Sequence, residues 1–209
     1  MPRILEKKER SLGVKLSRKG ERASSPKAAL IRKPNRPGPQ GKRYRGKVSE
    51  YGLQLQEKQK VKFSYGVTER QLRNMFKGAL KKARSRGASE TNSVIDVLEK
   101  RLDNVIMRLG ITEGRSLARQ MVSHGHFLVN GRRVKTPSYK VKVGDKISIR
   151  PQSQSASYFV GVADRIKKYE PPAWLKIDKS NLEGEVMGQP EAVGGLFNIS
   201  LIVDYYSKR

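Results

Sequence analysis

Positive charge is distributed very unevenly along this sequence. Of its 209 residues, 45 are Lys or Arg and 19 are Asp or Glu, which gives a formal net charge of +26. Residues 1–48 hold 16 basic and 3 acidic residues, whereas residues 151–209 hold 7 of each. Charge of one sign at this density opposes compaction through self-repulsion. We therefore expect the N-terminal quarter to be held by a polyanionic partner and not by a core of its own.

The segment 33–46, KPNRPGPQGKRYRG, adds to this expectation because it is rich in Pro and Gly and has no helical or strand period. We interpret residues 1–48 as an extended basic arm, with a weak indication of a short helix at residues 26–31. The alternative is a disordered, solvated tail. Lys and Arg spread among turn-forming residues favour the arm, since a solubilising tail does not need that arrangement.

Nucleic acid is the favoured polyanion, because each Lys or Arg near a phosphate releases a condensed counterion. A membrane surface would require an amphipathic anchor or a long apolar run, and the sequence has neither. The N-terminus also lacks the apolar stretch of a secretory signal. We expect a cytoplasmic protein, or one of an equivalent organelle compartment.

Helical patterns follow the arm. Ser49 is expected to cap a helix over residues 50–63, and Thr68 with Gln71 forms a capping box that opens a second helix. Apolar residues recur at threes and fours along the second helix. Its other face carries only cations: Arg70, Arg73, Lys77, Lys81, Lys82 and Arg84. A solvated helix usually mixes charges to gain Glu–Lys pairs, so this face indicates a polyanionic partner.

The period changes from helical to alternating in the second half of the chain. Helices are expected over residues 93–109 and, capped by Thr112, over residues 113–123. Asn130-Gly131 then predicts a type I′ hairpin between residues 127–129 and 132–134. Further strands are expected at 140–143, 146–149, 174–177 and 199–206, and a helix within 158–169.

The fold class expected from these patterns is α+β, with a basic arm, a small helical domain and an inserted module of helices and a small antiparallel sheet. The boundaries are 1–48 for the arm, 49–92 for the helical domain, 93–157 for the module and 158–209 for a C-terminal helix and strands. Part of residues 170–209 could complete the helical domain.

The unit of two helices, hairpin and strand pair matches a known family. Its residues read LEKRLDNVIMRLG, then RSLARQMVSHGHFLVNGRRVKTPSYKVKVGDKISI. They resemble the RNA-binding module named after small-subunit ribosomal protein four, which also occurs in tyrosyl-tRNA synthetases and pseudouridine synthases. The flanks SEYGLQLQEKQKVKFSYGVTERQLRNMF, PPAWLKID and LIVDYYS are similar to segments of the ribosomal protein itself. The chain thus resembles the bacterial-type ribosomal protein four family over nearly its whole length.

The resemblance implies a structural component of the small ribosomal subunit and no enzyme. Members of the family bind small-subunit rRNA directly and nucleate assembly of the subunit body. They contact small-subunit protein five, at an interface tied to translational accuracy, and line the channel through which mRNA enters, near protein three. Arg43, Arg45 and Lys47 fall in the segment that matches the channel lining. An RNA-modifying enzyme with the same module would need a catalytic domain, for which the sequence shows no constellation.

The expected rRNA contacts are the cationic and hydrogen-bonding side chains of these segments. They are Arg3, Arg10, Lys15, Arg22, Lys27, Arg32, Lys33, Arg36, Tyr51, Lys58, Lys62, Arg70, Arg73, Lys77, Arg101, Arg115, Arg119, His124, His126, Asn130, Arg132, Arg133 and Lys135. Such a surface suits folded RNA, which is recognised largely by shape and phosphate position.

No metal or other cofactor is expected. Many members of the family hold zinc with four cysteines in the N-terminal arm, but this sequence has no cysteine, and Ala23 and Ala28 stand about where two would be. The sequence therefore resembles the zinc-free variant. His124 and His126 lack a third ligand. Glu99 and Asp103 have Arg neighbours at helical spacing, so ion pairing is favoured over a catalytic carboxylate pair.

Overall fold

The computed structural model describes residues 5–16, 25–39, 41, 47–167, 169–190 and 197–207. The chain divides into two compact units, Met1–Ile95 with Ala192–Arg209, and Asp96–Glu191. The first is helical and the second combines helices with an antiparallel sheet, so the expected α+β class is confirmed. The C-terminal block expected at 158–209 is divided between the two units.

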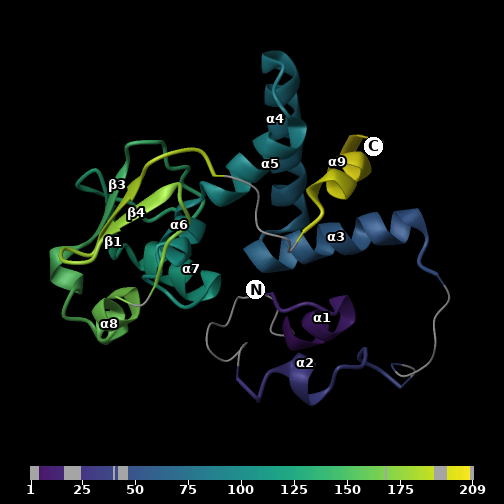
Figure 1. The fold of residues 1–209 in the computed structure, drawn as a ribbon, viewed down its shortest axis with the longest axis horizontal. Coiled ribbons are helices and arrows are strands. Elements are labelled where there is room, and N and C mark those ends of the chain that lie inside the picture. The colour runs from purple at the N-terminus through teal and green to yellow at the C-terminus, as the bar shows by residue number, and fades with distance from the viewer. Residues whose placement is uncertain are drawn as a thin grey trace. The chain divides into compact units, whose positions relative to one another are not determined.

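The first unit is built on helices α3 (Glu50–Tyr65), α4 (Glu69–Arg86) and α9 (Ile199–Ser207), with α9 lying along α3 and α4 (Figure 1). Both caps expected in this unit form, whereas the cap expected at Thr112 is wrong, because the helix there begins at Arg115 with Gly114 as its N-cap residue. The Ser49 hydroxyl accepts a hydrogen bond from Gly52 N at 3.2 Å. Thr68 N donates to Gln71 Oε1 at 3.0 Å, and Gln71 N donates to the Thr68 hydroxyl at 3.3 Å. These bonds satisfy amide groups that a helix start leaves without partners.

The expectation of a strand at 199–206 is wrong, because these residues form the helix α9. Its β-branched residues favour a strand by local preference. Ile199, Ile202 and Val203, however, are spaced by threes and fours and are all buried, so packing against α3 and α4 determines the structure. Asn198 opens the helix by accepting a hydrogen bond from Leu201 N.

The described part of the arm is also more ordered than expected. It contains α1 (Leu5–Leu12), which was not expected, and α2 (Ala29–Arg32), which overlaps the short helix weakly indicated at residues 26–31. Leu16 is only 1% exposed, and its carbonyl accepts a hydrogen bond from the Ser64 hydroxyl of α3 at 3.4 Å. The buried Glu9 carboxylate accepts from Leu16 N at 3.3 Å. This part of the arm therefore packs on α3 and is not an extended segment held by phosphates alone.

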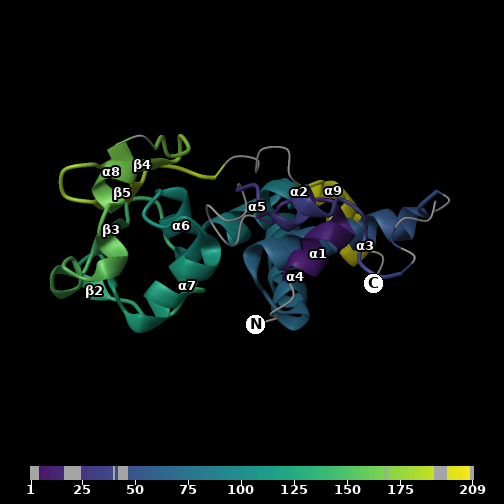
Figure 2. The same ribbon diagram turned by 90° about the horizontal axis from the view of Figure 1, so that it is seen from below.

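The second unit contains a five-stranded antiparallel sheet in the order β2-β1-β3-β5-β4. The strands are β1 (Phe127–Val129), β2 (Arg132–Arg133), β3 (Lys146–Ile149), β4 (Leu175–Asp178) and β5 (Glu183–Val186). Helices α6 (Leu102–Arg108) and α7 (Arg115–His124) lie together against one face of the sheet (Figure 2). Helix α8 (Val162–Lys167) contributes Val162 and Ile166 to the same core.

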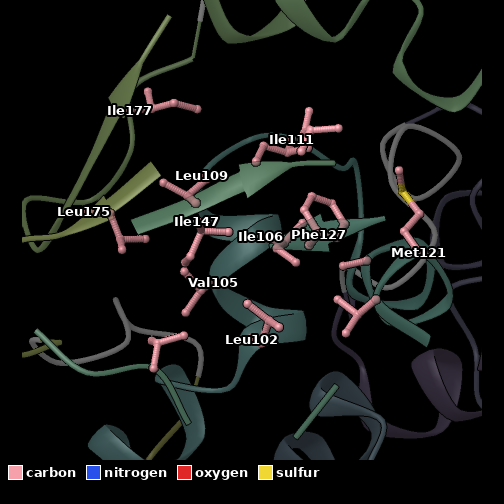
Figure 3. Packing of buried hydrophobic residues seen from close by; sticks show 14 of the residues in the cluster. Leu102, Val105, Ile106, Leu109, Ile111, Met121, Phe127, Ile147, Leu175 and Ile177 are labelled. Atoms are coloured by element: carbon pink, nitrogen blue, oxygen red, sulfur yellow. The ribbon is translucent and has the colours of Figure 1, made fainter. Parts of the chain in front are cut away.

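The core of the second unit forms where α6 meets the sheet. Val105, Ile106 and Leu109 point from α6 toward Phe127 and Ile147 of the strands (Figure 3). Close contact needs a small residue on β5, since a Cβ at Gly184 would lie 2.3 Å from Leu109 Cδ1. This tight packing fixes the sheet on the helices.

Two local predictions in this region are wrong. The single helix expected at 93–109 is two helices, α5 (Glu90–Glu99) and α6, which meet at an extended Arg101. The strand expected at 140–143 reduces to one bridge between Arg101 and Lys140. The two errors have one cause, because Leu102 N donates to Tyr139 O and Val141 N donates to Lys100 O. These long-range bonds break the helix and occupy the groups that a strand would have used.

Candidate nucleic-acid interface

The first candidate surface is a row of cations on α4, which we call the α4 stripe. It consists of Arg70, Arg73, Lys77, Lys81 and Arg84, which are all exposed and share one side of the helix. The apolar side of α4 is buried in the first unit. A surface hollow beside the stripe is lined by Arg70, Arg73 and Lys77 together with Glu69 and Asn74. Burial of the apolar side of α4 therefore fixes the helix so that the α4 stripe faces solvent.

The second candidate surface surrounds the hairpin of the second unit. Asn130 and Gly131 adopt φ values of 49° and 76°, as the type I′ turn requires, so the predicted hairpin is confirmed. The Asn130 side chain donates to Asp145 Oδ1 at 2.8 Å and accepts from Lys146 N at 2.9 Å. It therefore ties the turn to β3. Arg132 and Lys135 are exposed beside the turn.

Arg133 joins the hairpin to the end of α7. Its guanidinium donates to Gly125 O at 3.1 Å and to His124 O at 3.0 Å. A cation at this position stabilises the carbonyl groups that the last helical turn leaves unpaired. Because a Cβ at Gly125 would lie 2.4 Å from Arg133 Nε, and because Gly125 has a φ of 76°, this arrangement depends on glycine. Arg133 is thus fixed in place while it remains exposed.

The two histidines differ in their surroundings. His124 is exposed, whereas His126 is half-buried and its Nδ1 lies 3.0 Å from the Ser153 hydroxyl. Burial, followed by the charges of His124, Arg133 and Arg150, lowers the pKa of His126 below its ordinary value. His126 is therefore neutral near pH 7. Among the described residues, no group of three or more His, Cys, Asp or Glu side chains could hold a metal ion.

Three residues expected on the surface lie in the interior. Arg101 is 4% exposed and forms two hydrogen bonds to the Asp103 carboxylate, at 2.7 and 3.1 Å. Arg115 is buried and donates to Asn104 Oδ1 at 2.8 Å. Lys58 is 5% exposed. The expectation that these cations face RNA is corrected, since each is held by partners within its own unit.

The other expected contacts are more accessible. The exposed ones among those described are Lys15, Lys27, Arg32, Lys33, Lys47, Tyr51, Arg70, Arg73, Lys77, His124, Asn130, Arg132, Arg133 and Lys135. The half-buried ones are Arg10, Arg36, Lys62, Arg119 and His126. Arg3, Arg22, Arg43 and Arg45 lie outside the described residues, so their assignment as contacts stays a prediction. Arg10 binds the carbonyl groups of Lys33 and Asn35 and so holds α1 to the segment after α2.

Comparison with known proteins gives a consistent result. Residues 5–99 match the ribosomal protein S4/S9 N-terminal domain, and residues 100–147 match the S4 domain. Small ribosomal subunit protein uS4 of Chlorobaculum tepidum is 42% identical over 206 residues, which cover 98% of this chain and 97% of that protein. The protein of the same name in Caldicellulosiruptor bescii is 46% identical, over 94% of this chain and 93% of that protein. The chain belongs to the uS4 family. The resemblance seen in the sequence is thereby confirmed.

In this uS4 family member, the boundary between the two matched regions lies at residues 99 and 100, where α5 ends. The two acidic residues nearby form ion pairs as expected, although their partners are not at helical spacing. Arg108 binds the buried Glu99 at 3.0 Å, and Arg101 binds Asp103. None of the helices in the described parts of the chain has the length and apolar character needed to cross a bilayer.

Sequence reasoning missed some exposed cations of the hairpin surface. Lys142 and Lys146 are exposed, and Lys146 begins the strand that pairs with β1. The available signal was the alternation of Lys with Val and Ile across residues 140–147. We therefore define the hairpin surface as the exposed cations Arg132, Lys135, Lys142 and Lys146.

The buried Lys58 belongs to a polar network in the first unit of this uS4 family member. Its Nζ donates to Glu69 Oε1 at 2.8 Å and to the Tyr205 hydroxyl at 3.1 Å, and Lys62 donates to Glu69 Oε2 at 2.9 Å. Burial acts to raise the pKa of Glu69, but the hydrogen bonds from Lys58 and Lys62 outweigh it, so the pKa is lowered below the ordinary value of 4.5. The network links α3, α4 and α9.

Acidification is therefore expected to weaken the first unit. Because the folded-state pKa of Glu69 is lowered, its contribution to stability is present above about pH 4.5 and is lost as the pH falls through the folded value. The urea midpoint, measured by helical circular dichroism at pH 3, 5 and 7, should fall at low pH less steeply in Glu69→Gln than in wild type. Glu90→Gln, which removes another acidic partner of α4, is the control. An unchanged pH dependence in Glu69→Gln would contradict this assignment.

Proposed function

We propose that this uS4 family member binds small-subunit rRNA directly, as a structural component of the small ribosomal subunit. The observation that carries the proposal is the α4 stripe, where five exposed cations share one helix face. Arg84 of the stripe is ion-paired with Glu90 at 2.9 Å, and the like charges of the other four residues repel one another unless a polyanion neutralises them. The relatives, which are small ribosomal subunit proteins, supply the identity of that polyanion.

The hairpin surface supports the same function in the second unit. Arg132 and Lys135 are exposed on a hairpin that is tied to both α7 and β3, and Lys146 is exposed on β3 itself. A rigid cationic edge can grip phosphates across the grooves of a folded RNA without reading bases. The proposed role is thus positioning and shape recognition, without catalysis.

Finer parts of the function rest on the resemblance to the ribosomal protein four family. They are nucleation of subunit-body assembly, a contact with protein five that affects translational accuracy, and a contribution near protein three to the channel for mRNA, through Arg43, Arg45 and Lys47. The proposed location is the small subunit in the cytoplasm or an organelle. The zinc of other family members does not fit this chain, because it has no cysteine ligands. A metal assay of the purified protein should find no stoichiometric zinc.

Salt titration of RNA binding tests the proposed function. The full-length chain should bind purified small-subunit rRNA with log affinity falling linearly with log salt, by roughly 10³ to 10⁵ between 50 and 200 mM if about 6 to 10 phosphates are contacted. An unrelated structured RNA of equal length is the control for specificity. An affinity that does not change with salt concentration, or an equal affinity for the control RNA, would count against the proposal.

A further inference from the structure

Three aromatic rings form a row on the second unit, and Tyr158 is its outer member. The rings of His124 and His126 have centroids 5.9 Å apart, and those of His126 and Tyr158 are also 5.9 Å apart. His124 is exposed, and Tyr158 is 52% exposed. We call His124, His126 and Tyr158 the ring row. Tyr158 lies outside the segments to which the sequence assigned RNA contacts.

The ring row is held by the core beneath it. Tyr158 lies in the short 3-10 helix Ser157–Phe159, next to Phe159, which is buried. Phe159 packs edge-on against His126 at 6.0 Å and against Phe127 at 6.1 Å between centroids. The hydrogen bond between His126 Nδ1 and Ser153 holds the middle ring. Tyr158 is therefore presented to solvent from an anchored segment.

The charges around the ring row favour a polyanion over an apolar protein partner. Arg133 binds the His124 carbonyl, and both Arg133 and Arg150 act electrostatically on His126. His126 itself is neutral near pH 7, so its ring does not carry the hydration shell of a charged imidazolium. A neutral imidazole and a phenol ring with guanidinium groups nearby are a combination that can bind an unpaired base together with its phosphates.

We propose that the ring row is a stacking site for an unpaired nucleobase of the rRNA, with Tyr158 as the platform and Arg133 and Arg150 placed for the adjoining phosphates. The inference rests on the proposed function and adds to it a base contact beside contacts with the backbone. Stacking tolerates any base, since every base has a π face. The site therefore selects an unpaired nucleotide by its accessibility and not by its sequence.

Substitution of Tyr158 in the full-length chain tests the site. Tyr158→Ala should lower the affinity for small-subunit rRNA on the order of 5- to 150-fold, as expected for the loss of one stacked base. The slope against log salt should stay unchanged, because no phosphate contact is removed. Tyr158→Phe keeps the ring and should bind within about twofold of wild type. Tyr139→Ala, at another exposed tyrosine of the unit, is the matched control and should bind as wild type.

Several outcomes would overturn the proposal. They are wild-type affinity in Tyr158→Ala, equal losses in Tyr158→Ala and Tyr158→Phe, and a Tyr139→Ala loss as large as that of Tyr158→Ala. Thermal unfolding of each variant excludes misfolding as the cause. In reconstituted subunits carrying 4-thiouridine, Tyr158 should cross-link to RNA. A cross-link from Tyr158 to a protein instead would show that the ring row contacts a protein, and would overturn the proposal. If wild type itself fails to bind rRNA in a salt-dependent way, the proposed function fails and not the ring row alone.

Discussion

Replacing Asp103 by alanine is expected to destabilise the second unit by about 3 to 5 kcal/mol. The Arg101 guanidinium is buried and forms two hydrogen bonds to the Asp103 carboxylate. Removal of the carboxylate would leave an uncompensated cation where water cannot reach it. The free-energy cost of this unpaired charge is far larger than the net stabilisation from the ion pair, because the guanidinium has lost its hydration without gaining a partner. The loss would fall on the junction of α5 and α6, because Arg101 immediately precedes α6.

Replacement of both partners separates the cost of an unpaired charge from the value of the pair. The double variant Arg101→Met/Asp103→Leu should recover most of the lost stability, since apolar residues of similar size often replace a buried pair with little effect. Urea unfolding can be followed by fluorescence of Trp174, the single tryptophan of the chain, which is buried in this unit. A double variant as unstable as Asp103→Ala would indicate that the pair itself, and not the unpaired charge, determines stability.

Features set by neighbouring residues were predictable from the sequence. The Thr68–Gln71 capping box and the Asn130-Gly131 turn each depend on a few adjacent positions, and both form as expected. The cationic face of α4 was also predictable, because its apolar side fixes which side chains are exposed. Lys82, which the pattern assigned to that face, is the exception, since it lies roughly 140° from Lys77 around the helix.

Features set by distant residues were not predictable in the same way. Residues in α9 favour a strand locally, and only their packing against α3 and α4 makes them helical. The break at Arg101 depends on backbone bonds to residues 139 and 141. Arg101 and Arg115 were assigned to the surface because a charged residue is seldom fully buried. Their interior positions depend on Asp103 and Asn104, whose orientation the sequence pattern does not give.

The α4 stripe should supply a large share of the salt-sensitive RNA affinity. The double variant Arg73→Gln/Lys77→Gln removes two exposed cations beside the hollow on α4. If both contact phosphates, the affinity for small-subunit rRNA should fall by about one to two orders of magnitude. The slope of log affinity against log salt should become shallower by about 2, one unit for each lost contact. Filter binding at four or more salt concentrations measures both quantities.

A matched control exists on the same helix. Lys82 and Arg86 are exposed on α4 but turned roughly 140° to 180° away from Lys77 by the helical period. The variant Lys82→Gln/Arg86→Gln removes the same net charge, so a purely long-range electrostatic effect would weaken binding equally in both variants. A contact effect would weaken binding only in the stripe variant, because short-range phosphate contacts depend on position and not on net charge. Equal losses and equal slopes in the two variants would therefore show that α4 contributes charge alone, and that rRNA contacts must be sought on the hairpin surface.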